Sequence, residues 1–537
     1  MNVLAATHIL RLAYDAGVRC VCVCAGSRNS PLLASLGGTR GVQIFSFADE
    51  RGAAFFALGW SKRAGAPVAV ITTSGTAVAE MLPAAIEAFY SGIPLMLITA
   101  DRPARYRGSG APQAIEQRGI FGPYAEPCID LDVDAALALA ALEWTQRRPL
   151  HINIAFDEPL IDGPVPDLLI SEALPQNQRL PAVPADVEPL RRALETWRRP
   201  LVLLGGLTSR DRDAVRTFAR QLGAPVYAEP LSGLRDDPAI AQILVRSGER
   251  MLARGGFDGV VRIGGVPALR FWRDLDETRY ELPVVSVSPL PFPGLAPSTS
   301  DVQRHVIQGE ISAILSAIEV PPRGRDDGFH DEDAAMAKRF AAILDDEPRS
   351  ELAMVRALSR AIPRGSHIFL GNSLPIREWD LAAVREPRDF AFAANRGANG
   401  IDGEISTFFG LCDPNAANVC LAGDLTALYD LGAPWIVRQL DERVRFTIAV
   451  LNNGGGRIFS RVASLRALPA AVREGIIENS HALRFEGWAS MWGLSYAALE
   501  TVPDPLPAGD RGVLELLPDV AASKRVWDRY DAMWSSR

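Results

Sequence analysis

The chain has 537 residues, of which 48% are hydrophobic and 22% charged, with a formal net charge of -8 at pH 7. This length exceeds what one hydrophobic core supports, so two to four domains are expected in a protein of ordinary globular composition. The acidic balance argues against nucleic acid as the main partner, and no apolar stretch is long enough to span a bilayer.

Cysteine and lysine usage narrows the possible chemistry. Six cysteines are too few for a disulfide framework in a chain of this length. Cys20, Cys22 and Cys24 alternate with valine, which is typical of small core residues on one strand. Only Lys62, Lys338 and Lys524 are lysines, and their polar helical surroundings predict exposed side chains, so a Schiff-base lysine is not expected. The N-terminus lacks a basic start and a cleavage site, and a cytoplasmic protein is expected.

The first part of the chain alternates short apolar strands with helical patterns, as in a doubly wound α/β domain. A predicted strand at 19–24 runs into a turn containing Ser27 and Arg28, which is either an anion site or an ordinary helix cap with a solvated arginine. The strand at 43–47 leads to Glu50, just before a strongly apolar helix. Glu50 is therefore either a desolvated acid with a raised pKa or a first-turn residue favoured by the helix dipole.

Two further strands of this domain also end in polar or small residues. The strand at 68–72 precedes Ser74 and Gly75, and the strand at 94–99 precedes Arg102. Because the carboxyl ends of parallel strands meet at one edge of a sheet, these residues are expected at the edge that binds ligands.

The middle of the chain has weaker signals. A proline-rich polar stretch at 166–185 and a charged stretch at 321–335 predict linkers. Strands at 200–204 and 260–263 each end in Gly-Gly, interpreted as turns because the dinucleotide fingerprint GxGxxG is absent. The expected domains are residues 1–165, 185–320 and 345–537.

The last domain contains the most informative stretch. An apolar strand at 418–422 ends at Gly423-Asp424, and a second at 446–451 ends at Asn452, followed by Asn453 and three glycines. A crossover between parallel strands would bring Asp424, Asn452 and the carbonyl of Gly454 to one edge. These are hard oxygen ligands of the kind that Mg²⁺ prefers. Alternatively, Asp424 only caps a helix and the glycines only form a turn.

The motifs in this order resemble those of one thiamine diphosphate (ThDP) family, the 2-succinyl-5-enolpyruvyl-6-hydroxy-3-cyclohexene-1-carboxylate synthases of menaquinone and phylloquinone biosynthesis. The motifs are AGSRNSPL, DERGAAFFALG, TSGTAVAEMLPAAIEA, TADRPARYRGSGAPQAIEQ, GNSLPIR, NRGANGIDG, GDLTALYDL and NNGGGRIF. TADRP and NRGANGIDG separate this family from the acetolactate synthases and pyruvate decarboxylases. The middle domain matches only loosely.

The resemblance implies three doubly wound parallel α/β domains. The first would bind the pyrimidine, the second would be a middle domain, and the third would bind the diphosphate. The cofactors would be ThDP and Mg²⁺ or Mn²⁺, held between the first domain of one subunit and the third of its partner. A homodimer or a dimer of dimers follows. The implied reaction is decarboxylation of 2-oxoglutarate and conjugate addition of the succinyl carbanion equivalent to isochorismate.

The resemblance also assigns roles to residues. Glu50 would hydrogen-bond the aminopyrimidine, Ile401 would be the wedge that keeps the cofactor bent, and the metal would be held by Asp424, Asn452 and Gly454. The other cofactor-binding positions are Ser74, Gly75, Asn372, Ser373, Gly423, Leu425, Thr426, Ile458 and Phe459. The substrate-binding positions are Ser27, Arg28, Arg102, Gln113, Arg270, Ser373, Arg377 and Arg396.

This chain departs from the family pattern in places. Ala25 replaces a usual proline, Pro112 replaces a frequent asparagine, and Arg270 with Phe271 stands where basic residues including a lysine can occur. These changes affect the expected substrate contacts more than the expected cofactor.

Three other functions were weighed. A different ThDP carboligase or decarboxylase would act on another 2-oxo acid, but TADRP and NRGANGIDG argue against it. A non-catalytic cofactor-binding protein would be expected to lack Glu50, Asp424 or Asn452, and all three are present. A nicotinamide or flavin oxidoreductase is disfavoured by the missing dinucleotide fingerprint.

Overall fold

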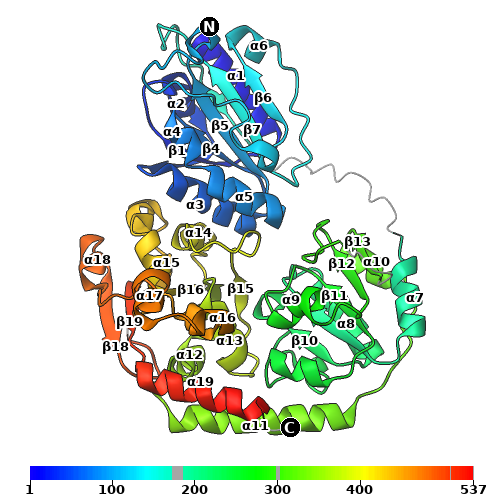
Figure 1. Ribbon diagram of the computed structural model, residues 1–537. Coiled ribbons are helices and arrows are strands. Elements are labelled where there is room, and N and C mark those ends of the chain that lie inside the picture. Colours follow the sequence, from blue (N-terminus) through cyan, green and yellow to red (C-terminus); the bar gives the residue numbers. More distant parts are fainter. Residues whose placement is uncertain (172–185, 298–302, 508, 536–537) are drawn as a thin grey trace. The chain divides into compact units, whose positions relative to one another are not determined.

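The computed structural model describes residues 1–171, 186–297, 303–507 and 509–535 (Figure 1). Three larger sheets flanked by helices form its framework, and every strand pair in them is parallel. This confirms the expected α/β class with three doubly wound sheets. By their contacts the residues form two compact units. The first contains the chain before the first gap together with Asn395–Asn415 and Leu425–Val444, and the second contains the other described residues. No described helix is both long and apolar enough to cross a membrane.

The sheet of the first unit has the strand order β3-β1-β4-β5-β7-β6. Its strands are β1 (Cys20–Cys24), β3 (Gln43–Phe47), β4 (Val68–Thr72), β5 (Leu95–Asp101), β6 (Cys128–Leu131) and β7 (Leu150–Ala155). Helices α1 (Asn2–Asp15), α2 (Ser30–Gly37) and α6 (Val133–Ala138) cover one face, and α3 (Glu50–Ala64) and α5 (Leu82–Ser91) the other (Figure 1). The cysteines of β1 are free and buried, as expected of core residues.

A short strand pair extends this unit into the first predicted linker. Strand β8 (Leu168–Leu169) pairs with β2 (Thr39–Arg40). Residues 172–185 of the predicted linker lie outside the described residues. Ordered pairing therefore continues a few residues beyond position 165.

The second unit contains the middle sheet, of order β10-β9-β11-β12-β13. The strands are β9 (Pro200–Leu204), β10 (Val226–Ala228), β11 (Gly259–Ile263), β12 (Val284–Ser288) and β13 (Arg304–Gln308), with helices α7 (Glu188–Thr196), α8 (Arg212–Leu222), α9 (Arg270–Glu277) and α10 (Ile311–Ser316). A Cβ added at Gly205 would lie 2.2 Å from the carbonyl oxygen of Gly265. The glycines after β9 and β11 thus let two backbones approach closely, which a simple turn does not require.

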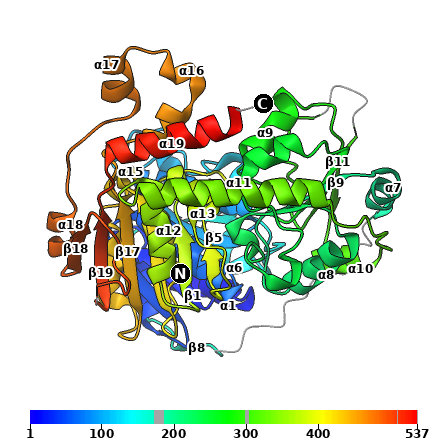
Figure 2. The ribbon, with the colours of Figure 1, turned by 90° about the horizontal axis from the view of Figure 1, so that it is seen from below.

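The third sheet has the order β15-β14-β16-β17-β19-β18. Its strands are β14 (His367–Leu370), β15 (Ala391–Ala393), β16 (Ala417–Gly423), β17 (Arg445–Leu451), β18 (Ser495–Leu499) and β19 (Arg511–Leu516), with helices α12 (Glu351–Ala361) and α13 (Leu374–Ala382) against it. Helix α11 (Asp327–Asp346) lies beside α19 (Val520–Ser535), as Figure 2 shows.

The second predicted linker is wrong from residue 327 onward, where α11 begins. Asp326 caps this helix by accepting a hydrogen bond from the amide of Phe329 at 3.1 Å. Phe329 and His330 are buried although charged residues surround them in the sequence. The high density of charged residues therefore led to the prediction of a linker where the chain forms an amphipathic helix.

Glycines allow two helices of the first unit to pack backbone against backbone. A Cβ at Gly59 of α3 would lie 2.0 Å from the carbonyl oxygen of Thr407, and one at Gly410 would lie 2.1 Å from that of Phe56. Thr407 and Gly410 belong to α14 (Glu404–Leu411). This close crossing places the end of the NRGANGIDG motif against the N-terminal domain.

Candidate active site

Four neighbouring strands of the first sheet end at one edge in residues that the sequence singled out. Strands β3, β1, β4 and β5 are adjacent and parallel. Strand β3 is followed by Glu50, and β1 by Ser27 and Arg28. Strand β4 is followed by Ser74 and Gly75, and β5 by Arg102. The structure thus brings these residues to the edge where open parallel sheets bind ligands.

Glu50 is both a helix residue and a partly desolvated acid. It is the first residue of α3, whose cap Asp49 accepts a hydrogen bond from the amide of Arg51 at 3.0 Å. Burial raises the pKa of Glu50, and the charges of Asp49 and Glu80 raise it further, against the lowering by a backbone hydrogen bond. A carboxyl with a raised pKa at a strand end is suited to hydrogen-bond and protonate a bound base.

The Gly75 turn is tightly constrained. Gly75 has φ +89° and precedes the short helix α4 (Thr76–Ala79). A Cβ at this position would lie 3.3 Å from the Cα atom of Gln113, whose own φ is +55°. The segment that carries Gln113 therefore packs directly on the turn, and the positive φ favours glycine there.

Within the second unit, adjacent strands β16 and β17 bring Asp424 and Asn452 together. Asp424 Oδ2 accepts hydrogen bonds from the amides of Gly454 at 2.8 Å and Gly455 at 2.9 Å. Asn452 Nδ2 donates to the carbonyl oxygen of Leu483 at 2.9 Å and to Glu515 Oε1 at 2.6 Å, so its oxygen is the end that accepts from Gly454, at 3.3 Å.

The donor set at these strand ends fits a hard divalent cation. Asp424 offers a carboxylate, Asn452 an amide oxygen and Gly454 a carbonyl, the oxygen types that Mg²⁺ or Mn²⁺ accepts. The Gly454 carbonyl accepts a hydrogen bond from the amide of His481 at 3.1 Å, and a carbonyl oxygen has a second lone pair for a metal. The described residues contain no group of three or more His, Cys, Asp or Glu side chains arranged for a metal.

Backbone strain marks one further candidate position, Ser373. Ser373 has φ +67° and ψ -121° directly before α13, a conformation that residues other than glycine rarely adopt. Its neighbour Asn372 is buried. Gly455 has φ +132°, and a Cβ there would lie 2.6 Å from the carbonyl oxygen of Glu478, so only glycine fits.

The remaining cofactor candidates are distributed over both units. In the first unit Ile401 and Leu425 are half-buried and Thr426 is buried. In the second unit Ile458 and Phe459 belong to the short helix η7 (Arg457–Arg461), where Phe459 is exposed.

Comparisons with known proteins identify the family of the chain. The family model described as "Thiamine pyrophosphate enzyme, N-terminal TPP binding domain" matches residues 4–120. A 2-succinyl-5-enolpyruvyl-6-hydroxy-3-cyclohexene-1-carboxylate synthase of Bdellovibrio bacteriovorus is 43% identical over 99% of this chain and 99% of its own length. Synthases of the same name are 38% identical in Akkermansia muciniphila, over 94% of each chain, and 33% identical in Halobacterium salinarum, over 98% of this chain and 97% of the relative.

The chain belongs to the 2-succinyl-5-enolpyruvyl-6-hydroxy-3-cyclohexene-1-carboxylate synthase family. The resemblance read from the motifs is thereby confirmed.

The candidate arginines differ in how they are held. Arg28 donates to the carbonyl oxygen of Phe156 at 3.0 Å, and Arg102 Nε donates to that of Pro112 at 3.0 Å. Arg377 donates to the carbonyl oxygen of its neighbour Ser373 at 2.5 Å. These contacts hold the three guanidinium groups beside strand ends, and Arg28 Nη1 also lies 3.4 Å from Glu158 Oε1.

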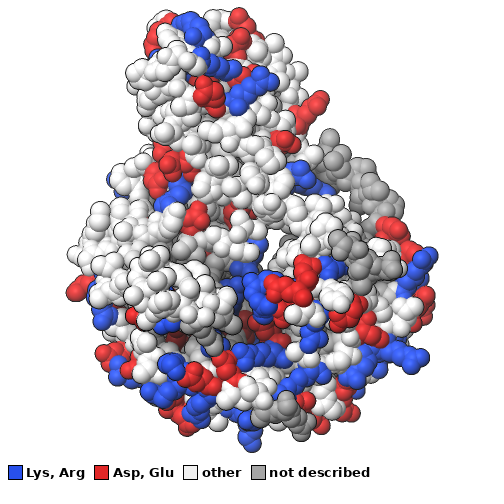
Figure 3. All heavy atoms as spheres, in the orientation of Figure 1, with Lys and Arg blue, Asp and Glu red and all other residues white. Residues whose placement is uncertain are grey.

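Arg270 has a different environment. Its half-exposed side chain pairs with Asp274 at 2.5 Å and Glu277 at 2.6 Å, both on its own helix α9. Figure 3 shows blue Lys and Arg side chains next to red Asp and Glu side chains at several places on the face drawn, separated by uncharged areas. The structure therefore gives Arg270 the contacts of a surface ion pair, and its role in substrate binding stays a prediction.

The sequence missed a buried charge pair next to the NRGANGIDG motif. The expectation that Lys62 is exposed is wrong: its side chain is 15% exposed and its Nζ lies 3.7 Å from Glu87 Oε1. Burial lowers the pKa of Lys62, against the raising effect of Glu87. Glu87 accepts hydrogen bonds from the amides of Gly397 at 2.9 Å and Ala398 at 2.7 Å, and so holds the segment next to Arg396. Local sequence patterns could not reveal this arrangement, because the amide of Gly397 that binds Glu87 lies 310 positions away in the chain.

Proposed function

We propose that this protein catalyses the ThDP- and Mg²⁺-dependent decarboxylation of 2-oxoglutarate and the conjugate addition of the succinyl unit to isochorismate. The products are 2-succinyl-5-enolpyruvyl-6-hydroxy-3-cyclohexene-1-carboxylate and CO₂, in menaquinone biosynthesis. The observation that carries the proposal is 43% identity, over 99% of both chains, to a protein named as this synthase.

The proposed cofactor contacts follow from the donor sets. When bound, ThDP supplies a nucleophilic thiazolium carbon and an electron sink for the decarboxylation. Glu50 would hold a proton at the aminopyrimidine ring, and its burial-raised pKa suits that role. Asp424, Asn452 and the carbonyl of Gly454 would hold Mg²⁺ or Mn²⁺ at the diphosphate.

The proposed substrate contacts rest on charge. The two substrates together present four carboxylates, and guanidinium groups bind carboxylates through paired hydrogen bonds. Arg28, Arg102, Arg377 and Arg396 are the candidates for these contacts, with Gln113 beside them. The fixed position of Arg102 at the end of β5 supports the assignment, because its Nε is held by Pro112 while the other nitrogens remain available to a ligand.

The proposal includes a homodimer or a dimer of dimers in the cytoplasm. In the family that the motifs resemble, the cofactor lies between the first domain of one subunit and the third of its partner. The separate placement of Glu50 and Asp424 on two different sheets is compatible with such a shared site.

The test is consumption of 2-oxoglutarate and isochorismate by purified protein, with and without ThDP and Mg²⁺. Coupled, cofactor-dependent loss of both substrates is expected. Loss of 2-oxoglutarate alone would assign the protein to another ThDP carboligase or decarboxylase activity. ThDP binding without any turnover would favour a non-catalytic protein.

A further inference from the structure

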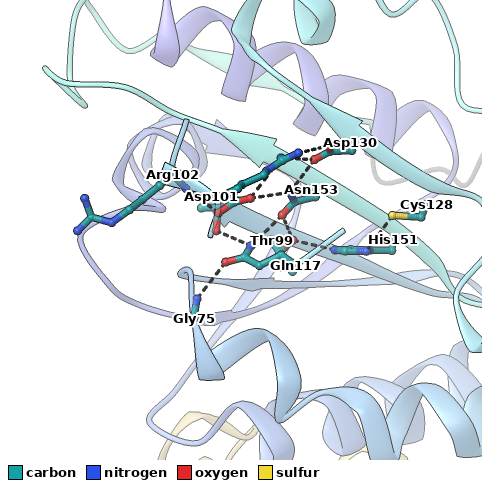
Figure 4. Close-up of polar contacts among 11 residues, drawn as sticks. Gly75, Thr99, Asp101, Arg102, Gln117, Cys128, Asp130, His151 and Asn153 are labelled. Atoms are coloured by element: carbon teal, nitrogen blue, oxygen red, sulfur yellow. Dashed lines mark hydrogen bonds and ion pairs between the residues drawn. The ribbon is translucent and has the colours of Figure 1, made fainter. Parts of the chain in front are cut away.

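A connected set of buried hydrogen bonds lies beneath the candidate edge of the first sheet (Figure 4). At its centre is Gln117, whose side chain is almost completely buried. Gln117 Oε1 accepts a hydrogen bond from the amide of Gly75 at 3.0 Å. Its Nε2 donates to the carbonyl oxygen of Ala100 at 3.1 Å and to Asn153 Oδ1 at 2.8 Å. One side chain thus reaches the Gly75 turn, the end of β5 and strand β7.

The orientation of the Gln117 amide is determined by two carboxylates. Asn153 Nδ2 donates to Asp101 Oδ2 at 3.0 Å and to Asp130 Oδ1 at 2.8 Å. Because ionised carboxylates only accept hydrogen bonds, Asn153 must turn its NH₂ toward them and its oxygen toward Gln117. Gln117 must then offer its own NH₂ to Asn153, which leaves its oxygen for Gly75. The charge of the aspartates therefore fixes the acceptor that holds the turn.

Neighbouring groups keep Asp130 ionised and His151 neutral. Arg107 donates two hydrogen bonds to Asp130, at 2.8 Å each. Although burial raises it, hydrogen bonds from Arg107 and Asn153 hold the pKa of Asp130 below its ordinary value. On the other side His151 lies 2.8 Å from Thr99 Oγ1, and burial lowers the pKa of His151 to about 4, so this ring is neutral near pH 7.

The same hydrogen bonds connect the turn to the candidate substrate residues. Asp101 Oδ1 accepts from the amide of Arg102 at 2.7 Å, and Arg102 Nε donates to the carbonyl oxygen of Pro112 at 3.0 Å. The Cα of Gln113 lies against Gly75, at 3.3 Å from the place a Cβ would take. Gln117 therefore closes a loop of contacts around Gly75, Arg102 and Gln113.

We propose that Gln117 is a positioning residue that holds the cofactor turn at Gly75 and the substrate groups Arg102 and Gln113 as one unit. It does this through its neighbours and without touching the reactants. The proposal rests on the proposed function, which places ThDP at Gly75 and a substrate carboxylate at Arg102. It follows that one substitution at Gln117 changes cofactor affinity and substrate KM together.

The experiment compares Gln117→Met with the wild-type protein in Mg²⁺. The dissociation constant of ThDP, the KM of each substrate, kcat and the melting temperature are measured. Methionine fills similar space but leaves the buried amide of Gly75 without its acceptor, so ThDP binding is expected to weaken by roughly ten-fold or more. The KM values are expected to rise, with a smaller change in kcat at saturating ThDP and substrate.

A second variant, Gln117→Glu, supplies a pH readout that a purely structural role would not give. An ionised glutamate would face two acceptors, the carbonyl of Ala100 and Oδ1 of Asn153, with Asp101 and Asp130 nearby and Arg107 beyond them. Burial and the charges of the two aspartates raise the pKa of the new carboxyl, against the lowering effect of the more distant Arg107. When protonated it can again accept from Gly75 and donate once. Its ThDP affinity, relative to wild type, is therefore expected to recover from about pH 8 to about pH 6, whereas that of Gln117→Met is not.

The matched control is Thr99→Val. Thr99 donates to Asn153 Oδ1 at 2.7 Å from the far side, and its loss leaves all three bonds of Gln117 in place. This variant is expected to melt at a lower temperature with unchanged ThDP affinity and KM.

Two results would overturn the proposal. One is wild-type ThDP affinity and KM in Gln117→Met, even with a lowered melting temperature. The other is an equal loss of affinity in Thr99→Val. If Gln117→Met does not fold, a Gln117→Glu affinity without the expected pH dependence also overturns it. Failure of the wild-type protein to consume the substrates would instead count against the proposed function, and the ThDP-affinity comparison would still test Gln117.

Discussion

Replacement of Glu87 by glutamine tests how the segment before Ile401 is held. The Glu87 carboxylate accepts from the amides of Gly397 at 2.9 Å and Ala398 at 2.7 Å and from Ser91 Oγ at 2.8 Å, and lies 3.7 Å from Lys62 Nζ. Glutamine removes the charge and turns one acceptor into a donor that faces another N–H. Hydrogen bonds to charged groups contribute about 1.5–3 kcal/mol each, and breaking a buried ion pair costs about 3–5 kcal/mol. Both side chains are largely buried, so a loss of about 3 kcal/mol in unfolding free energy is expected.

The assay is urea unfolding of Glu87→Gln, of Lys62→Met and of the double variant. The coupling energy from this cycle measures the interaction between Lys62 and Glu87, because effects of each variant on other partners, such as the Lys62 hydrogen bond to Asn395 Oδ1 at 2.8 Å, cancel where they are independent of the second substitution. The KM of the substrates should also rise, because Gly397 follows directly on Arg396. Ser91→Ala is the matched control: it removes one part-buried hydrogen bond to the same carboxylate and is expected to cost about 1.5 kcal/mol, the lower end of the range for bonds to charged groups.

The reasoning would be refuted if Glu87→Gln cost no more stability than Ser91→Ala. A coupling energy near zero would likewise show that Lys62 and Glu87 do not stabilise each other. The first result would mean that backbone packing, and not the Glu87 carboxylate, holds the segment.

Three further predictions concern the candidate site. Glu50→Gln should lower kcat by about 10²-fold or more while the melting temperature and most ThDP affinity are retained, because glutamine cannot exchange the proton; near-wild-type turnover would disprove the role of Glu50. Asp424→Ala should weaken ThDP binding in Mg²⁺, and equal affinity for the variant and wild type in a titration would contradict the metal site. Burial raises the pKa of Glu351 to about 7, where Asn453 Nδ2 donates to it at 2.6 Å. Since the folded pKa exceeds the unfolded one, the cost of ionising Glu351 is absent below about pH 4.5 and complete above about pH 7. The test is urea unfolding of the metal-free proteins at each pH. The unfolding free energy of Glu351→Gln minus that of the wild type should increase by up to about 3 kcal/mol as the pH rises from about 5 to about 8. A difference between the two proteins that does not change with pH would contradict this.

Much of the framework could be predicted from local patterns. The strands at Gln43–Phe47, Val68–Thr72 and Pro200–Leu204 were predicted with the bounds that the structure has. A strand buried on both faces is a short apolar run, and a parallel strand must end in a turn before its crossover, so both features are written locally in the sequence. The linker prediction failed at α11 because high charge density concealed the buried face that includes Phe329.

The sequence by itself determined the class of sheet, the edge at which polar residues gather and the family to which the chain belongs. Only the tertiary structure decided which buried polar groups meet. Glu87 and Gly397 are 310 positions apart, and Gln117 and Gly75 are 42 apart. Local periodicity records that a residue faces the interior, but it carries no information about the partner that satisfies a buried hydrogen-bonding group. That partner is set by how distant elements pack, as where Gly59 and Gly410 bring two helices into backbone contact.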